Sequence, residues 1–271
     1  MDRMSFNPAL LQIDIPARPE AMVKLAQLLA KEKVDLGALA SLIESDMALA
    51  AAVMKAVNSP VYGLKGRVKT VQQATTYLGT REISALAYDF GLRSVFPQAA
   101  TLDEIWARAS IRGLLMGRLA ESLCMDAWSA HTAGLFEECG KAILFKHDPE
   151  AYMQIMVVAR NDVELAVLEL ESFGISHDKL GAKLCKSWGL SPAALASVEN
   201  HVQVISDLEL PHTPGRSICV LSGLAHALMN DPEQLEEICM ALAPQAMMDQ
   251  TLLLRGARKV KDKLDEYLAD A

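Results

Sequence analysis

Apolar residues recur along this chain at the spacing of helical faces. After two prolines, Met22, Leu25 and Leu28 follow one another three residues apart, which predicts an amphipathic helix over about 19–31. No segment alternates apolar and polar residues between hairpin turns, as a strand exposed on one face would. The pattern therefore predicts an all-α protein.

Capping side chains and prolines mark where the other helices begin. Asp35 and Asp46 precede helical segments, and Asp148-Pro149, Ser191-Pro192 and Asp231-Pro232 each combine a cap with proline in the first turn. Further helices are expected at about 35–43, 47–57, 70–78, 80–94, 101–124, 129–139, 149–160, 162–173, 177–188, 192–205, 214–229, 232–241 and 246–268.

Other short motifs refine these boundaries. Thr101 and Glu104 have the spacing of a capping box, and the Gly79-Thr80 pair predicts a break between two helices. The segment GLFEECGK ends in Cys-Gly-Lys, so we expect the helix over 129–139 to finish near Gly140.

Composition supports a helical, folded chain. About half of the 271 residues are hydrophobic, and alanine, leucine and methionine, all strong helix formers, are plentiful. The net charge of −8 disfavours a general binder of nucleic-acid backbones, which needs a basic surface. We therefore expect no nucleic-acid partner.

Cysteine spacing and the amino-terminal sequence indicate a cytoplasmic protein. The five cysteines lie far apart without a CxxC pair, which is typical of buried free thiols in a reducing compartment. The first residues lack a basic segment followed by an apolar one, and no uncharged apolar stretch approaches membrane-spanning length. No membrane association is expected.

Three long segments resemble the HDOD family of bacterial regulatory domains. These are IPARPEAMVKLAQLL, LASLIESDMALAAAVMKAVNSPVYG and VQQATTYLGTREISALA, and the similarity continues through IWARAS, HTAGLFEECGK, FGISHDKLGAKLCKSWGLSP and VENHV. The resemblance implies an HDOD domain over 13–205, with an N-terminal helical part over about 13–95 and an HD-like part over about 96–205. It also implies a multi-helix HD-domain-like bundle, preceded by an N-terminal helical layer. The helices of 206–271 are expected to pack on the HD-like part.

The resemblance also identifies where a metal site would stand. HD phosphohydrolases bind divalent ions through a histidine in W-x-H-S, a His-Asp pair in G-L-x-H-D-I-G-K and a later aspartate. At these positions the chain has Trp106-Ala107-Arg108, Glu137-Glu138 and, near the last one, Ser222 or Gly223. The resemblance therefore implies a degenerate metal site, with no metal, no cofactor and no catalytic residue expected.

Two interpretations of the glutamate pair remain open beside that of a solvated helix edge. Carboxylates accept hard cations, so Glu137 and Glu138 could hold a metal by themselves. However, a fixed positive charge on Arg108 would repel the ion. We therefore expect Arg108 to replace the metal and to pair with one of the two glutamates.

The histidines offer further candidates for this vestigial pocket. His177 and His201 match histidines of the family, and His131 precedes the glutamates on the same predicted helix. A neutral, hydrogen-bonding role is expected for His177, because the dipole at a helix start disfavours its protonated form. The His147-Asp148 dipeptide is expected to be structural, since Asp148 can cap the helix that follows.

The family signature residues have structural explanations. Asp46 is a predicted cap, Asn58 stands at a helix end where a left-handed conformation is tolerated, and Gly63 and Gly79 permit turns. These positions are expected to shape the N-terminal helical layer.

These observations favour a non-enzymatic regulatory protein of bacterial signal transduction that acts through a protein partner or a small ligand. The alternative is a divergent HD-type phosphohydrolase that uses Glu137, Glu138, His177 and His201. Hydrolysis of cyclic dinucleotides is disfavoured because residues 190–215 contain no Gly-Tyr-Pro segment. The partner, the signal, the pathway and the oligomeric state stay open.

Overall fold

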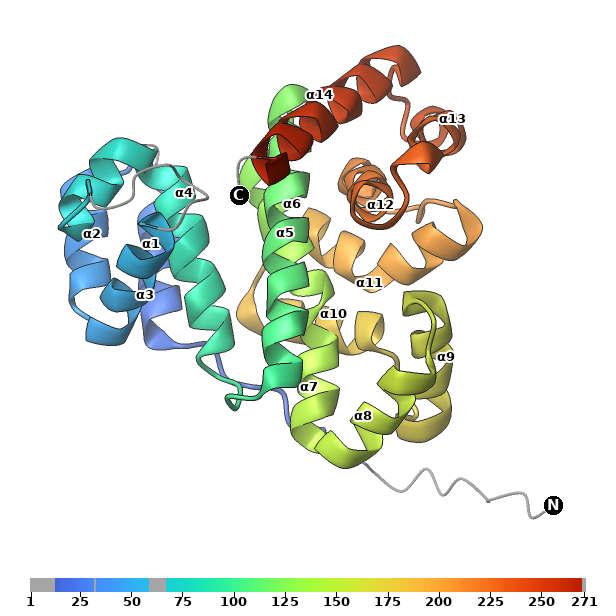
Figure 1. The fold of residues 1–271 in the computed structure, drawn as a ribbon, viewed down its shortest axis with the longest axis horizontal. Helices are drawn as coiled ribbons and strands as arrows, with labels where there is room; N and C mark the ends of the chain where they lie inside the picture. Colours follow the sequence, from blue (N-terminus) through green and yellow to red (C-terminus); the bar gives the residue numbers. More distant parts are fainter. Residues whose placement is uncertain (1–12, 32, 59–66, 270–271) are drawn as a thin grey trace.

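The computed structural model describes residues 13–31, 33–58 and 67–269, and within these ranges the chain is helical without strands (Figure 1). The elements are α1 (Glu20–Leu29), α2 (Leu36–Glu44), α3 (Met47–Val57), α4 (Val71–Arg93), α5 (Ala100–Ser122), α6 (Ala127–Glu137), α7 (Cys139–His147), α8 (Pro149–Val158), α9 (Asp162–Phe173), α10 (His177–Trp188), α11 (Pro192–Asp207), α12 (Arg216–Asn230), η2 (Pro232–Gln234), α13 (Leu235–Gln245) and α14 (Gln250–Ala269).

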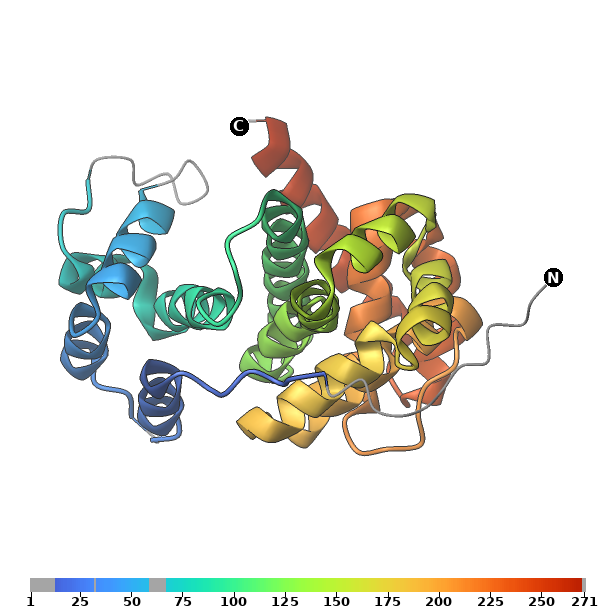
Figure 2. The same cartoon turned by 90° about the horizontal axis from the view of Figure 1, so that it is seen from below.

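Helices α1 to α4 form a smaller lobe on one side of the long helix α5, and the remaining helices form a larger lobe on the other side (Figures 1 and 2). The segment before α1 connects the two lobes. The indole Nε1 of Trp188 donates to the carbonyl oxygen of Pro16 at 2.8 Å, and Arg18 donates to the carbonyl oxygen of Trp188 at 2.6 Å. Arg18 also donates to the hydroxyl of Tyr88 at 2.8 Å, so this segment joins α10 to α4.

Two glycines allow helices of the larger lobe to approach closely. A Cβ atom on Gly134 of α6 would lie 2.8 Å from the carbonyl oxygen of Arg112 on α5. A Cβ atom on Gly140 of α7 would overlap the backbone carbonyl of His177 on α10. Because backbone atoms cannot move aside as a flexible side chain can, both positions require glycine for this packing.

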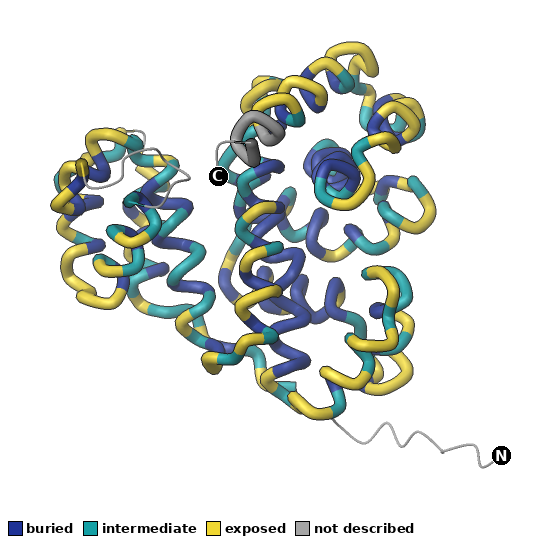
Figure 3. Tube along the Cα trace, viewed as in Figure 1, coloured by how far each residue is buried: buried dark blue, intermediate teal, exposed yellow. Residues whose placement is uncertain are grey.

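Buried residues are dark blue in Figure 3, and the apolar ones among them form two clusters. The first connects the smaller lobe with α5 to α11, and the second connects α5, α6 and α11 with α12 to α14. In the second cluster, Leu115 and Leu119 of α5 are buried together with Leu221 and Leu224 of α12 and Leu242 of α13. The C-terminal helices therefore share a core with the helices that position the glutamate pair.

Most predicted helix starts are confirmed. The side chains of Asp35, Asp46, Asp148 and Ser191 each accept a hydrogen bond from a backbone N–H in the first turn of the helix that follows. The capping box at Thr101 is wrong, because α5 already begins at Ala100 and has no side-chain cap.

The expected helix end at Gly140 is also wrong. The chain makes only a short break at Glu138 and continues as α7 through Gly140 to His147. Glycine and lysine often follow a helix end, but here glycine serves the contact with α10 and lysine is buried.

The signature residues of the smaller lobe have mixed outcomes. Gly79 has a φ of 77° and interrupts α4, which confirms the predicted break. Asn58 has a φ of −87°, so the left-handed conformation is wrong; its amide instead donates to the carbonyl oxygens of Met54 and Val68. Gly63 lies outside the described residues.

Within the described ranges, no single helix is both long enough and apolar enough to cross a membrane. Helices α2 and α3 meet that test only when taken together, and they are bent by 116° relative to each other.

Candidate functional site

The two glutamates stand at the joint between α6 and α7, inside the larger lobe. Glu137 is the last residue of α6 and is 0% exposed, and Glu138 in the break is 1% exposed. The interpretation of the pair as a solvated helix edge is therefore wrong for both residues. Buried carboxylates require positive charges or hydrogen-bond donors nearby, because burial without them is costly.

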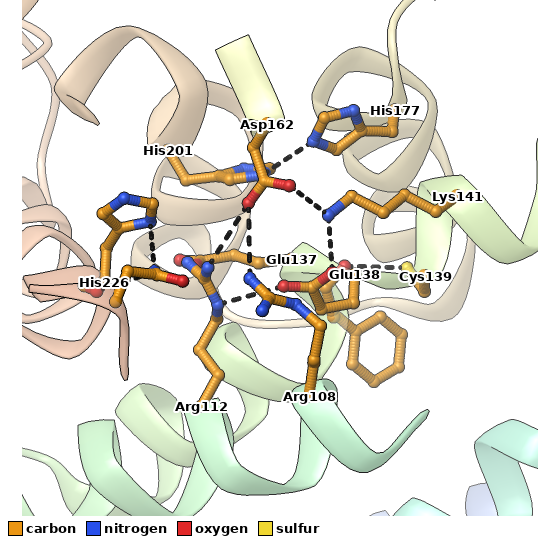
Figure 4. Close-up of polar contacts among 12 residues, drawn as sticks. Arg108, Arg112, Glu137, Glu138, Cys139, Lys141, Asp162, His177, His201 and His226 are labelled. Carbon is orange, nitrogen blue, oxygen red and sulfur yellow. Dashed lines mark hydrogen bonds and ion pairs between the residues drawn. The ribbon is translucent and has the colours of Figure 1, made fainter. Parts of the chain in front are cut away.

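Arg112 of α5 supplies the first of these positive charges (Figure 4). Its guanidinium Nη1 donates to Oε2 of Glu137 at 2.8 Å, and its Nε lies 3.2 Å from Oε1 of Glu138. The side chain is completely buried, and its Nη2 is 3.7 Å from Oδ2 of Asp162. One guanidinium thus faces three carboxylates.

The expected pairing of Arg108 with a glutamate is corrected by this geometry. Arg108 lies one helical turn before Arg112, its side chain is 41% exposed, and its ion pair is with Asp162 at 3.8 Å. Both arginines are on the same face of α5, since residues four apart are neighbours on a helix. Arg112 reaches the glutamates because it lies deeper in the lobe, opposite the α6–α7 joint.

Lys141 of α7 supplies the second buried charge. Its Nζ donates to Oε2 of Glu138 and to Oδ1 of Asp162, both at 2.7 Å. Asp162 begins α9, so the lysine connects the start of α9 to the α6–α7 joint. Figure 4 shows Asp162 between the lysine and the two arginines.

This cluster stabilises the ionised forms of Glu138, Asp162, Arg112 and Lys141. Burial opposes ionisation of Glu138, but Lys141 and Arg112 outweigh it and lower the pKa of Glu138 to about 2. Burial likewise opposes the charge of Asp162, and the same two cations hold its pKa well below the usual range. In return, the carboxylates outweigh the effect of burial on Arg112 and Lys141 and raise the pKa of both cations.

Hydroxyl groups complete the environment of Glu137. Ser197 of α11 donates to Oε1 at 2.8 Å, and Ser222 of α12 donates to Oε2 at 2.9 Å. Ser222 stands where the sequence predicted the replacement for the last metal-binding aspartate. Its hydrogen bond brings α12 into contact with the α6–α7 joint.

The two family histidines lie together in a second buried network. Nε2 of His177 is 3.2 Å from Nε2 of His201, and both residues are at most 2% exposed. Glu169 of α9 accepts from the backbone N–H of His177 at 2.6 Å and lies 2.6 Å from its Nδ1. Tyr152 of α8 donates its hydroxyl proton to the other oxygen of Glu169, also at 2.6 Å.

His131 does not belong to the pocket. Its ring stacks on Trp128, and it lies against Gly113 and Gly117 of α5, on the side nearer Asp89 of α4. The residue is on the helix that leads to Glu138, but the close approach of α5 and α6 directs its side chain toward the smaller lobe. The expected pocket role of His131 is therefore wrong.

A cavity of about 430 Å³ opens beside the ion-pair cluster. Glu138, Lys141 and Asp162 form its inner wall, and Arg108 and Arg160 lie nearer its mouth. Apolar side chains from α5, α8 and α9 form another part of the lining. The polar residues Glu104, Asn161 and Asn230 also line the cavity, as does His226 of α12, whose pKa burial lowers to about 4. The cavity combines fixed charges with an apolar wall, as small-molecule sites commonly do.

The residues present fit a divalent metal poorly at the family position. The oxygens of Glu138 lie 3.2 Å from Arg112 and 2.7 Å from Lys141, so cations already occupy the space in front of them. In the described ranges, no three His, Cys, Asp or Glu side chains converge as metal ligands would. A metal here would have to displace two buried positive charges.

Sequence reasoning missed six residues of these networks: Arg112, Lys141, Tyr152, Asp162, Glu169 and Ser197. Two signals were available. Arg112 follows Arg108 by one turn on the same helix face, and Lys141 ends the segment HTAGLFEECGK that carries the family resemblance. Tyr152, Asp162 and Glu169 lie on helices without a recognisable motif, and only the packing of α8 and α9 brings them to the site.

Comparison with known proteins agrees with this architecture. The chain is 26% identical over 222 residues to an uncharacterized protein of Treponema pallidum (strain Nichols); the match covers 80% of this chain and 42% of that protein. A structure named Putative signal transduction protein from Marinobacter aquaeolei VT8 has a TM-score of 0.73 and 22% identity, and covers 95% of this chain and 59% of its own. The structure of an HDOD domain protein with unknown function from Geobacter sulfurreducens has a TM-score of 0.72 and 18% identity. The match covers 94% of this chain and 93% of that chain.

The chain thus spans about two fifths of the curated relative and about three fifths of the Marinobacter chain. At these identities the structural likenesses show the fold alone. The family model of the HDOD domain matches residues 15–204, which is well over half of the sequence. The chain belongs to the HDOD domain family.

Proposed function

We propose that this protein is a non-catalytic regulatory module of bacterial signal transduction, in which a buried arginine and lysine replace the metal of the HD enzymes. The observation that carries the proposal is the position of Arg112. Its guanidinium is fully buried and lies within 3.2 Å of both glutamates that stand at the His-Asp position of the enzymes.

Electrostatics support this proposal over a hidden metal site. A divalent ion about 4 Å from a single positive charge is repelled by about 8 kcal/mol at an effective dielectric constant of about 20. Arg112 and Lys141 would both exert that repulsion, and neither loses its charge, since the pKa of each is raised. The glutamates are better satisfied by the cations of the chain itself.

The cavity beside the cluster is the proposed regulatory surface. It presents fixed charges, an apolar wall and the exposed Arg160, so it is suited to a small ligand or to a side chain of a protein partner. Because the ion pairs join α5, α6, α7 and α9, a molecule bound there would act on four helices at once. We expect such action to occur in the cytoplasm.

Metal analysis and a hydrolysis assay test the non-catalytic part. The protein is purified without chelator, its metal content is measured, and turnover of bis(p-nitrophenyl) phosphate is followed with and without added manganese. We expect metal far below one equivalent and no turnover above that of a Glu138→Ala control. Near-stoichiometric metal with turnover that Glu138→Ala abolishes would establish the alternative, a divergent phosphohydrolase.

A pair of arginine variants tests the regulatory cavity. Arg160 and Arg258 are both exposed and both pair with a glutamate, but only Arg160 lines the cavity. We expect Arg160→Ala to lose a small molecule that co-purifies with the wild-type protein in native mass spectrometry, and Arg258→Ala to retain it. Equal retention by both variants would exclude the cavity as the binding site.

A further inference from the structure

The imidazole rings of His177 and His201 form a contact whose hydrogen bonding depends on which ring nitrogens carry protons. Their centroids are 5.2 Å apart, and the two Nε2 atoms approach to 3.2 Å inside the lobe. A hydrogen bond across this distance needs one proton on one of the two nitrogens. The hydrogen-bond partner of Nδ1 in each ring indicates whether the Nε2 of that ring carries a proton.

On His201, Nδ1 lies 2.8 Å from the carbonyl oxygen of Val198. A carbonyl oxygen can only accept a hydrogen bond, so Nδ1 must carry the proton. In a neutral His201 the remaining nitrogen, Nε2, is therefore unprotonated and presents a lone pair to His177.

On His177, the opposite nitrogen faces a carboxyl group. Nδ1 lies 2.6 Å from Oε2 of Glu169, and the same oxygen accepts the backbone N–H of His177. The other oxygen of Glu169 accepts from Tyr152, which keeps its proton because burial and Glu169 raise the pKa of the phenol well above its usual value. With Nδ1 donating to this carboxylate, a neutral His177 would also present a bare Nε2.

Two unprotonated nitrogens would thus face each other at 3.2 Å in the buried interior of the lobe. We propose that Glu169, His177 and His201 form a buried proton-binding site. Together the three side chains hold one proton more than they would with Glu169 ionised and both histidines neutral. That proton is taken from solvent and lies between the two Nε2 atoms. It adds one positive charge, so the carboxylate and the imidazolium together have no net charge, which makes their burial less costly.

The extra proton belongs on the His177 side of the contact. Burial is the main reason why the pKa of His201 is lowered to about 4, so His201 is the acceptor. The dipole at the start of α10 opposes a charge on His177. A direct charge-assisted hydrogen bond to Glu169 is stronger than that dipole interaction, so the imidazolium is proposed here in place of the neutral ring expected from the helix start.

Charged groups on the neighbouring helices also face the pair. Glu137 of the α6–α7 joint favours a proton on His201, and Arg112 of α5 opposes it. Asp162 of α9 and Asp178 of α10 both interact with His177 through their charges, and both are themselves held ionised, Asp162 by Lys141 and Asp178 mainly by Ser176. Carboxylates therefore surround His177, whereas Arg112 faces His201.

The shared proton would make the packing of α10 on α11 depend on pH. Without it, the two Nε2 lone pairs repel, and the rings can regain donors only by moving apart. Movement of His201 would shift α11, whose Ser197 donates to Glu137 in the ion-pair cluster. This proton site is independent of whether the neighbouring cavity binds a ligand.

Histidine-ring NMR tests the proton site directly. In a two-bond ¹H–¹⁵N correlation spectrum, an imidazolium has two protonated nitrogens and a neutral ring has one. The full chain is measured at a pH of about 7.5, about one unit above the ordinary histidine pKa of about 6.5, and signals are assigned by removing single histidines. We expect His177 to give the signals of an imidazolium, and His201 those of the neutral Nδ1–H tautomer.

Two variants and one control complete the experiment. Glu169→Gln removes the carboxylate and should convert His177 to a neutral ring, whereas His212→Gln at an exposed site should leave both buried rings unchanged. If Glu169→Gln fails to fold, the wild-type spectrum alone is sufficient to test the proposal. A neutral His177 in the folded wild-type protein would overturn the proposal, as would bound metal whose removal by EDTA changes the signals of both rings.

Discussion

Replacing Arg112 by methionine should destabilise the protein far more than the same change at Arg108. Arg112→Met removes the cation that contacts both glutamates and leaves Glu137, among the described residues, with the hydroxyl donors Ser197 and Ser222 at 2.8 and 2.9 Å. Methionine preserves much of the side-chain volume, so the perturbation is mainly the loss of charge. Arg108→Met, one turn away on the same helix face, is the matched control.

The structure gives the size of both effects. Removing one partner of a buried ion pair costs about 3–5 kcal/mol, because the other charge stays buried without compensation. The side chain of Arg108 is 41% exposed and lies 3.8 Å from Asp162, so its loss should cost less than about 1 kcal/mol. A typical protein has an unfolding free energy of about 5–15 kcal/mol, so the loss at Arg112 is a large fraction of the stability and the loss at Arg108 is a small one.

Urea unfolding followed by circular dichroism measures both free energies. Adding Glu137→Gln to Arg112→Met removes the stranded charge and keeps an acceptor for Ser197, so we expect the double variant to recover at least about 1 kcal/mol. Arg112→Lys, which keeps the charge but loses the second contact, should lie between the wild type and Arg112→Met. Equal costs for Arg112→Met and Arg108→Met would refute the assignment of the buried cation.

Three further outcomes are expected. Gly140→Ala should prevent stable folding or cost more than about 3 kcal/mol in thermal unfolding, because its Cβ would overlap backbone atoms of α10. Gly117→Ala is the control. Its Cβ would meet only ordinary contacts at 3.4 Å or more, so the change should be neutral or stabilise the protein by up to about 1 kcal/mol. Ser222→Ala should cost about 1.5–3 kcal/mol in urea unfolding, because it removes a donor to a buried carboxylate, and a loss below about 0.5 kcal/mol would contradict that contact. Acidification should lower the free energy of unfolding in two stages. The first runs from about pH 6.5 toward 4, where the unfolded chain binds protons that His201 and the partly buried His226 resist, and the second from about 4.5 toward 2, where Glu138 loses its charge. His226→Asn should reduce the slope of the first stage and leave the second, and an unchanged slope would rule out that histidine as a contributor.

The sequence predicts the helices well because their signals are local. Caps such as Asp35, Asp46 and Asp148 act within one turn, and the apolar spacing of each helix depends only on its own residues. The errors arise where a distant contact decides. Gly140 looks like a helix end, yet α7 passes through it because α10 lies against its backbone.

The candidate site shows the same limit. The family resemblance fixes Glu137 and Glu138 to about one residue and the last position only to Ser222 or Gly223, and in the structure Ser222 donates a hydrogen bond to Glu137. It cannot distinguish Arg108 from Arg112, because both residues lie on one face of α5. They differ only in burial: the side chain of Arg108 is 41% exposed, whereas that of Arg112 is buried. Contacts across helices thus determine which residue acts, and the sequence pattern does not contain them.

The three donors to Glu137 have a consequence for how this protein folds. They come from α5, α11 and α12, so one carboxylate joins helices inside the matched region 15–204 to a helix beyond it. A fragment that stops at residue 205 would lose Ser222 and would expose Leu115 and Leu119 of α5 to water. The cooperative unit is therefore larger than the family domain, and helices α12 to α14 should unfold in the same transition as α5 and α6.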